Sequence, residues 1–464
     1  MTAPYDSISN YHEWTGSDAF AADVDAAVEF VEAEGIEAVY FVSPSVDGRP
    51  VGKLITKDLF ERVARRGIRM HPLAVSDFRA TVWGDSIAFG EQDAEGAMVA
   101  DFSTLRRLPW RPEFARVYCF YYDLETGELF DHDCRSTVAR HEQTFRRETD
   151  ANMFVGIEPE FMWLRRKESG ELEHTTDARA FYEVAYLEEF EPIMLDLLEY
   201  GRGMGLRITH ADAEDKSQVE VNQAPNSPLA YADDFFTYRQ ICRIVARKHG
   251  LIATFMPKPF MGDSANGHHH NLSLMSDDGE NVLAGDLKGA CELSELGVGF
   301  LAGLLEHADA LTLVGAPTAN SYKRFWDVGF WAPFHKSYGF NNRSCLFRIS
   351  DVGRIEARQM DSSCNPYLTI ASCLVAGLDG IRRGLDPGEP IQDNMMKDIS
   401  VPREERIPIT LTEAIEAFKG DDLMRELFQP RLYEAFVGAR QDELNRFWSQ
   451  VSPWELDFYL ERWP

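Results

Sequence analysis

Pairs of acidic residues two positions apart are the feature of this chain best suited to chemistry. Glu158 and Glu160 stand in FVGIEPEFMWL, residues 154–164, which has the period-two alternation of a β-strand. Side chains two residues apart share one face of a strand, so the two carboxylates are expected side by side. Two like charges that close repel each other unless a cation lies between them. For this segment taken by itself, the alternative to a metal site is that both glutamates lie on a solvated strand face.

Three further segments repeat the alternation and add Glu220, Glu356 and His269 as candidate metal ligands. His269 belongs to a run of three histidines in NGHHHNLSL, which suggests zinc at first sight. On a strand only alternate residues can share one metal, so this run supplies one or two ligands. Several carboxylates with one imidazole suit Mg²⁺ or Mn²⁺ better than structural zinc.

Arginines accompany the acids within 35 residues of sequence: Arg324, Arg343, Arg348, Arg354 and Arg358. The simplest interpretation is that these arginines form ion pairs at the protein surface. A guanidinium cluster beside divalent metals is, however, what phosphoryl transfer needs. The sequence contains neither a P-loop pattern, GxxxxGK[ST], nor a GxGxxG that follows a strand, so those nucleotide-binding motifs are excluded.

Length, charge and cysteine content narrow the class of protein. The 464 residues, 44% of them hydrophobic, suffice for two domains with a substantial core. A formal net charge of −29 argues against a nucleic-acid partner, because phosphates would be repelled. Seven cysteines without a CxxC pair indicate a reducing compartment. With no signal-peptide pattern and no apolar run of about 20 residues, we expect a cytoplasmic protein that does not enter a membrane.

The chain divides into a small first part and a large second part, so we expect an α+β protein. Helical spacing covers residues 21–36, two strands flank an Asp47–Gly48 turn, and a helix capped by Thr56 follows. Later helices are predicted over residues 183–203 and 232–249. We expect domains at 1–112 and 113–464, divided at the Pro/Trp-rich segment LPWRPEF.

Ordered motifs give this chain a resemblance to a known family. GIEPEF, ATFMPKPFMGD, NGHHHNLSL, PTANSYKR, NNRSCLFRI, GRIEARQMDSSCNPYL and AGLDGI occur in that order over some 300 residues. Together they resemble glutamine synthetase of the bacterial type and its amine-ligating relatives, the γ-glutamyl-amide synthetases. The resemblance implies a β-grasp-like N-terminal domain and a catalytic domain with a curved antiparallel sheet. It also implies a homo-oligomer, a dodecamer of two hexameric rings, in which the VDGRPVGKLI strand reaches a neighbour's active site.

The resemblance further implies ATP as a substrate and two Mg²⁺ or Mn²⁺ ions at each site. One ion would be held by Glu160, Asp212 and Glu220, and the other by Glu158, His269 and Glu356. The α-carboxylate of glutamate would meet Arg324 and Arg358, beside Gly267 and Ala265 of the glutamate loop. Arg343 would contact the transferred phosphate, and the nucleotide would be lined by Ser273, Arg348 and Arg354.

Several positions depart from the family pattern. The stretch RFWDVGFWAP, residues 324–333, replaces a flap whose glutamate binds ammonium and accepts its proton, and Trp331 precedes Ala332-Pro333 in the place of that glutamate. An indole offers a flat apolar surface instead. The plain alternative is that Trp326 and Trp331 are core residues. Ser264 and Ala265 replace the usual Asn-Gly, which leaves an acyl substrate other than glutamate open.

These features favour a ligase that joins the γ-carboxylate of glutamate to an organic amine through a γ-glutamyl phosphate. An arylamine fits best, because it is neutral near pH 7 and needs no anionic group to remove a proton first. Alkylamines and polyamines are cations near pH 7 and would need a nearby carboxylate, which Asp327 or Asp47 could supply. The alternatives are an ammonia-dependent glutamine synthetase and a catalytically silent relative with a regulatory or structural role.

Overall fold

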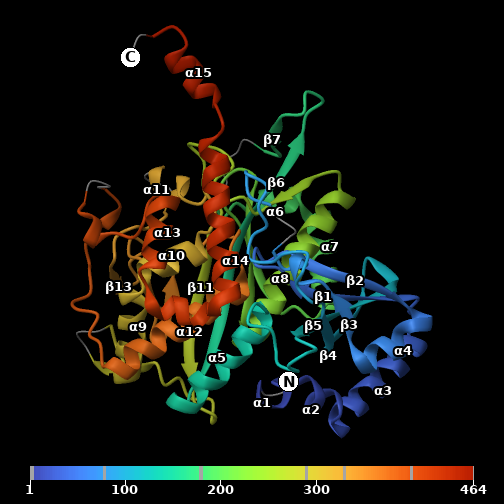
Figure 1. Ribbon diagram of the computed structural model, residues 1–464. Coiled ribbons are helices and arrows are strands. Elements are labelled where there is room, and N and C mark those ends of the chain that lie inside the picture. Colours follow the sequence, from blue (N-terminus) through green and yellow to red (C-terminus); the bar gives the residue numbers. More distant parts are fainter. Residues whose placement is uncertain are drawn as a thin grey trace.

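A computed structural model describes residues 5–76, 80–176, 181–287, 291–327, 331–397 and 401–462. Two β-sheets organise the chain, and helices cover them (Figure 1). The N-terminal elements lie together at one end of the molecule, in blue, and the C-terminal helix α15 (Pro453–Tyr459) projects from the opposite end. The expected α+β fold is confirmed.

The first sheet has five strands in the order β2-β1-β5-β4-β3. Its β1 and β5 run parallel, whereas its other neighbouring strands are antiparallel. The N-terminal elements are α1 (Tyr5–Ile8), α2 (Tyr11–Thr15), α3 (Asp18–Ala33), β1 (Ala38–Pro44), β2 (Pro50–Thr56), α4 (Lys57–Arg66), β3 (Ile68–Met70), the 3₁₀ helix η1 (Pro72–Ala74), β4 (Gly96–Leu108) and β5 (Arg111–Tyr122).

The predicted hairpin around Asp47 and Gly48 is formed by β1 and β2. Gly48 has a φ of +66°, and a Cβ there would lie 3.0 Å from an Arg239 guanidinium nitrogen and 3.1 Å from the Cα of Asn365. The turn therefore needs glycine for both its conformation and its close approach to the second domain. Thr56 occupies the N-cap of α4 as predicted, but its side chain makes no capping hydrogen bond.

The second sheet has nine strands and carries the candidate ligands. Its main path is β13-β14-β15-β11-β6-β9-β8, and β7 and β10 also pair with β6. Apart from the parallel pair β13–β14, its pairs are antiparallel, as expected. The strands are β6 (Asn152–Arg166), β7 (Leu172–His174), β8 (Ile208–Ala213), β9 (Gln218–Asn226), β10 (Ile252–Thr254), β11 (His268–Met275), β13 (Tyr338–Phe340), β14 (Phe347–Asp351) and β15 (Arg354–Ala357), and a short β12 covers Ala284–Leu287.

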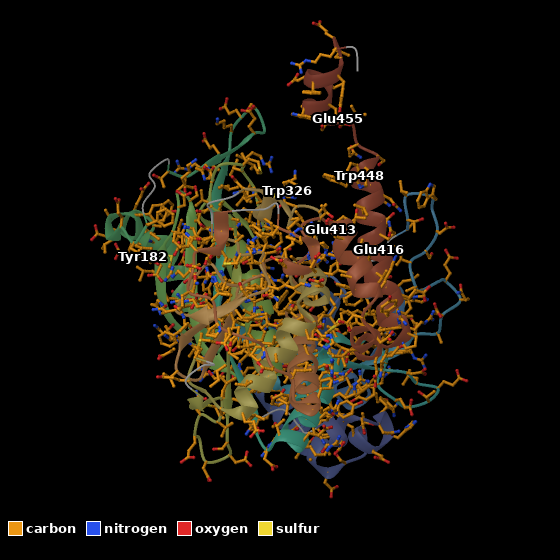
Figure 2. All side chains as sticks on the ribbon, turned by 90° about the vertical axis from the view of Figure 1, so that its left-hand side faces the viewer. Tyr182, Trp326, Glu413, Glu416, Trp448 and Glu455 are labelled. Atoms are coloured by element: carbon orange, nitrogen blue, oxygen red, sulfur yellow. The ribbon has the colours of Figure 1, made fainter. Side chains whose placement is uncertain are left out.

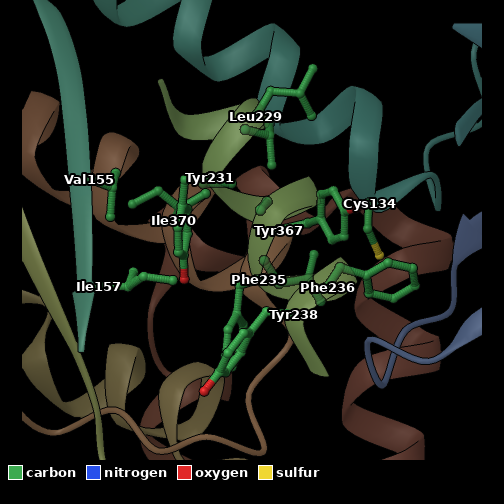
Figure 3. Packing of buried hydrophobic residues seen from close by; sticks show 14 of the residues in the cluster. Cys134, Val155, Ile157, Leu229, Tyr231, Phe235, Phe236, Tyr238, Tyr367 and Ile370 are labelled. Atoms are coloured by element: carbon green, nitrogen blue, oxygen red, sulfur yellow. The ribbon is translucent and has the colours of Figure 1, made fainter. Parts of the chain in front are cut away.

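Helices bury the inner face of the second sheet. Val155 and Ile157 of β6 lie beside Tyr231 of α8 and Ile370 of α12, and Tyr367 of α12 lies further from the strand, beside Phe236 (Figure 3). The helices are α5 (Cys134–Thr149), α6 (Val184–Glu189), α7 (Glu191–Gly203), α8 (Pro228–Lys248), α9 (Glu295–Glu306), α10 (Ala308–Gly315), α11 (Lys323–Trp326), α12 (Pro366–Arg383), α13 (Leu411–Lys419) and α14 (Asp422–Trp448), with 3₁₀ helices η3 (Met395–Lys397) and η4 (Arg403–Glu405).

The helix predicted over residues 183–203 is in fact two helices, α6 and α7, which meet at Phe190. Pro192 lies in the first turn of α7. Proline has no N–H to donate and disfavours a helical residue before it, so a continuous helix through this point is excluded. The helix predicted over 232–249 is α8, which begins earlier, at Pro228.

The first sheet continues past residue 112, because β5 extends to Tyr122 and pairs with both β1 and β4. A division after residue 112 would separate Arg111 and Pro112 from the rest of β5. We propose a domain boundary after β5 instead.

In the described residues, no single helix has the length and apolar composition to cross a membrane; α9 and α10 meet that test only as a pair bent by 72°.

A buried ion-pair network joins the two sheets through α5. The Arg135 guanidinium lies 2.6 Å from Asp101 of β4 and 2.8 Å from Asp233 of α8, and Tyr367 of α12 donates to Asp233 at 2.7 Å. Arg135 is fully buried. Removing one member of such a network leaves an uncompensated charge in a site without water.

We therefore expect Arg135→Met to lower the free energy of unfolding by about 3–5 kcal/mol, since Asp101 and Asp233 would repel each other unpaired. Arg146→Met is the matched control on the same helix, because Arg146 and its partner Asp277 are exposed and such pairs contribute about 0–1 kcal/mol. Urea denaturation of both variants measures the difference. Equal stability of the two would contradict the structural role of the network.

Candidate active site

Strand register brings the predicted metal ligands together. Glu158 of β6 stands directly opposite His269 of β11, and Glu160 stands opposite Glu220 of β9. On the other side of β11, Asn271 is paired with Glu356 of β15. Directly opposed residues have Cβ atoms about 4.5–5.5 Å apart, so three strands deliver carboxylates and β11 delivers an imidazole to one place.

Two groups of side chains have ligand atoms within 4.8 Å of one another: Glu158, His269 and Glu356, and Glu160, Glu220 and His269. Nδ1 of His269 lies 3.4 Å from Glu158 and 3.3 Å from Glu356. The first group is the one that the resemblance implied. The second contains His269 where Asp212 was expected.

Asp212 lies near this second group without joining it. It pairs across the strands with Glu220, and its Oδ2 lies 3.4 Å from the Asn222 amide nitrogen and 3.8 Å from Nε2 of His210. The aspartate side chain is one methylene shorter than glutamate, so it stops short of the shared ligand space. Asp212 as a direct ligand therefore stays a prediction.

The electrostatics of the cluster fit divalent cations. Burial, and then the charges of Glu158 and Glu160, raise the pKa of Glu220 well above its usual range. Burial alone would raise the pKa of Glu158 too, but hydrogen bonding and attraction from His269 lower it below its ordinary value. Oxygen-rich, mutually repelling ligands with one imidazole match Mg²⁺ or Mn²⁺.

The three histidines divide between the core and the site. His268 and His270 are fully buried, the first against the Phe235 ring at 3.9 Å and the second hydrogen-bonded to the Tyr231 hydroxyl at 2.7 Å. Burial lowers the pKa of His270 to about 4, so it is neutral at pH 7. Of the three histidines, His269 belongs to the candidate metal groups. The sequence predicted that this run would supply one or two metal ligands.

Arginines surround Glu356, which is completely buried. Arg348 donates to it at 2.9 Å, and Arg358 forms a shorter ion pair with its other oxygen. Burial alone would lower the pKa of Arg343. A hydrogen bond with Tyr182 and attraction to Glu356 and Glu158 outweigh this effect and raise its pKa. Arg354 lies further out, where it donates to the Ser350 hydroxyl at 2.8 Å. Ser273 lies along β11, opposite Phe154.

Gly267 is the meeting point of the metal groups and the arginine site. A Cβ on Gly267 would lie 3.2 Å from Nε2 of His269, 3.4 Å from Glu160 and 3.5 Å from the Arg324 guanidinium. Its N–H donates to Glu160 at 2.7 Å. The absence of a side chain here leaves open space between the candidate metal groups and the Arg324 guanidinium.

Several buried polar atoms of Arg324 and of residues 358–359 have no hydrogen-bond partner among the described residues. Nε of Arg324, Nε of Arg358 and both amide atoms of Gln359 are buried and make no hydrogen bond. Such atoms cost about 1–3 kcal/mol each when unpaired, so they favour a bound polar molecule. This set fits the glutamate end of the expected substrate pair.

A buried acid holds the segment 264–265 in place. Asp215, 1% exposed, accepts from both the backbone N–H and the hydroxyl of Ser264, at 3.1 and 3.2 Å. The carbonyl of Ala265 accepts from Gln218, which also donates to Glu160. Ser264 and Ala265 thus anchor the loop by hydrogen bonds to the strand that carries Glu220.

Both acids considered as helpers for a cationic amine are engaged in ion pairs. Asp327 lies 2.6 Å from the buried Lys258 ammonium and accepts from the Gly262 N–H. Asp47 forms an ion pair with Arg440 of α14. Asp327 therefore ties the start of the tryptophan-rich stretch to the 258–263 segment and is not a free base.

The two tryptophans of that stretch are not core residues. Trp326 and Trp331 are 55% and 56% exposed. Trp326 donates its indole N–H to the Ile409 carbonyl, beside Glu413 of α13 (Figure 2). Trp331 has a φ of +64°, a conformation that costs a residue with a Cβ free energy. Residues 328–330 between them lie outside the described part of the chain.

Two residues near the site were missed in the sequence. Burial, and then the charges of Glu160 and Asp212, raise the pKa of Glu214 to about 8. Its spacing of two from Asp212 was a signal for a shared face. Tyr182, which hydrogen-bonds Arg343, lies in a loop and has no such pattern. Figure 2 shows Tyr182 on the surface, and it is 62% exposed.

Gly267→Ala tests this geometry. The new methyl would push on His269 and Glu160, so we expect Mn²⁺ affinity and ATP-dependent turnover to fall about tenfold or more while the melting temperature is retained. Gly156→Ala on the neighbouring β6 is the control, because a Cβ there would meet only ordinary contacts at 3.5 Å or more. Unchanged Mn²⁺ binding in Gly267→Ala would contradict the proposed convergence.

Known proteins resemble this chain over most of its length. The model of the glutamine synthetase catalytic domain matches residues 131–459. Two curated relatives are both named glutamine synthetase. The Pyrococcus horikoshii protein is 32% identical, and the match covers 92% of this chain and 97% of that protein. The Thermus thermophilus protein is 36% identical, and the match covers 76% of this chain and 80% of that protein.

A solved structure, the GmaS/ADP complex, superposes with a TM-score of 0.84 at 29% identity, covering 94% of this chain and 99% of that one. An apo form of GmaS gives the same values. Members of the matched family are carbon–nitrogen ligases that use ATP and divalent metals. This chain belongs to the glutamine synthetase family.

Proposed function

We propose that this enzyme joins the γ-carboxylate of glutamate to an organic amine, with an arylamine as the favoured class. The observation that carries the proposal is the half-exposed Trp331 at the position where the family's ammonia-using members have a glutamate. An indole attracts flat apolar molecules, whereas a carboxylate attracts ammonium.

The reaction would proceed in two steps. The γ-carboxylate of glutamate attacks the γ-phosphate of ATP, which gives γ-glutamyl phosphate and ADP. The amine nitrogen then attacks the acyl carbon, phosphate leaves, and the nitrogen loses a proton. Bound divalent ions would offset the charge of the phosphates, held by Glu158, His269 and Glu356 and by Glu160 and Glu220 with Asp212.

The chain's own side chains would orient the substrates. Arg324 and Arg358 would bind the α-carboxylate of glutamate, beside the open space at Gly267. Arg343 would contact the transferred phosphoryl group, where guanidinium charge stabilises the transition state. Ser273, Arg348 and Arg354 would lie along the nucleotide. The similar GmaS structure is a complex with ADP, which supports a nucleotide site in that protein.

The ion pairs of Asp47 and Asp327 support an amine that arrives uncharged. An alkylamine is protonated near pH 7 and would need a free carboxylate to accept its proton. Lys258 and Arg440 already hold these two acids. An arylamine needs no such acid before it attacks.

Ammonia-dependent glutamine synthesis is the second candidate, because the curated relatives carry that name. It would require another group to bind ammonium in place of the flap glutamate. We also retain the proposals that the enzyme acts in the cytoplasm as a dodecamer of two hexameric rings, and that the hairpin carrying Asp47 contributes to a neighbour's site.

Kinetics of Trp331→Glu test the acceptor class. The change removes aromatic contact worth about 1–3 kcal/mol, so kcat/KM for an arylamine should fall about 10–100-fold. The values for ammonia and for an alkylamine should change less. Steady-state rates with the three amines, at saturating ATP and glutamate, give the comparison.

Trp326→Glu is the matched control, because Trp326 is equally exposed in the same stretch. It should leave the ratio of the three kcat/KM values unchanged even if stability falls. A uniform loss on all three amines in Trp331→Glu would contradict the role of Trp331 in acceptor choice.

A further inference from the structure

A second cavity, of about 440 Å³, lies behind the glutamate loop. Its walls come from the hairpin turn at Asp47–Arg49, from α8 and α14, and from residues 253–257, 318–320 and 362–363. The described walls contain none of the candidate metal ligands, so this cavity is separate from the metal groups of the same chain. Its hairpin wall is the segment that we propose contributes to a neighbour's site.

Positive charge dominates the α8 wall of the cavity. Arg239 is 7% exposed, and its guanidinium donates to the carbonyls of Cys364 and Gly48, at 3.0 and 2.8 Å. Arg243 lies one turn further along the helix, exposed to solvent. Neither arginine forms an ion pair with a carboxylate in the described part of the chain, whereas Arg440 on the opposite wall is paired with Asp47.

Arg239 and Arg243 repel each other, and the acids that line the cavity, Asp47 and Glu443, lie on its other walls, where Arg440 holds Asp47. Burial lowers the pKa of Arg239 to about 10, and Arg243 adds to this effect. Both stay cationic at neutral pH, so a bound anion would offset a real electrostatic cost.

A hydroxyl donor completes the cavity. Oγ1 of Thr254 accepts from the Met256 N–H, which leaves its own proton free to donate to a ligand. Guanidinium groups with a hydroxyl are the usual partners of phosphate and carboxylate oxygens. The volume falls in the range of small-molecule sites, about 300–1,000 Å³.

We propose that this cavity binds a small organic anion bearing phosphate or carboxylate groups, and that its occupancy acts on the glutamate loop of the active site.

The connection to the active site runs through Asn266. Its side chain donates to the Met256 carbonyl at 2.8 Å, and its backbone N–H donates to the Pro257 carbonyl at 2.8 Å. Its own carbonyl accepts from the Ser362 N–H, and the Ser362 hydroxyl donates to the Gly267 carbonyl at 2.8 Å. Gly267 in turn donates to Glu160. A shift of the cavity wall therefore reaches a candidate metal ligand through two residues.

Calorimetric titration of the full-length protein tests the proposal, with inorganic phosphate and citrate as separate probes at constant ionic strength. At least one probe should bind the wild-type protein. Arg243→Gln, at the exposed mouth, should weaken that binding at least tenfold. Arg247→Gln, one turn away on the exposed part of α8 and outside the cavity, should change it less than twofold.

Binding of phosphate alone would assign a phosphate-bearing ligand, and binding of citrate alone a polycarboxylate. Equal binding by wild type and Arg243→Gln would overturn the proposal, because the probe would then occupy the active site or no defined site. Failure of both probes to bind the wild-type protein would overturn it as well.

Hydrogen exchange gives an independent measurement of the coupling. The bound probe should slow exchange at residues 254–257 and 266–267 in the wild type but not in Arg243→Gln. These titrations contain neither ATP nor amine, so their outcome is separate from that of the proposed amide ligation.

Discussion

Mutual repulsion among buried carboxylates is the constraint on which the rest of this structure depends. Four neighbouring strands bring Glu158, Glu160, Glu220 and Glu356 around one imidazole. Such a cluster is stable only with compensating positive charge, which Arg348 and Arg358 supply for Glu356. The remaining charge is what divalent cations would neutralise. The strand register brings the carboxylates together, Gly267 leaves open space beside them, and the arginines offset part of their charge.

Much of the site could be predicted from the sequence because its ligands lie on strands. Period-two spacing places Glu158 with Glu160 on one face, and it separates His269 from His268 and His270. The register that sets Glu158 opposite His269 could not be predicted this way, because pairing depends on tertiary packing. Register does place Asp212 opposite Glu220, so the shorter aspartate side chain is the reason why His269 joins Glu160 and Glu220 in its place.

Ion pairs between residues far apart in the sequence could not be predicted from the sequence. Nothing local relates Asp47 to Arg440, or Lys258 to Asp327, yet these pairs decide which acids are free. The break between α6 and α7, by contrast, had a signal in Pro192. The domain boundary at residue 112 stays a prediction, and the Pro/Trp segment used for it lies within the turn and start of β5.

The distinction between ammonia and a larger amine rests on the environment of Trp331, and the most direct test uses the wild-type enzyme. ADP release and amide product should be measured with ATP, Mg²⁺ and glutamate against ammonia, an alkylamine and an arylamine. We expect one ADP per γ-glutamyl amide, with the highest kcat/KM for the arylamine. Equal or faster turnover with ammonia would contradict the proposed choice of acceptor.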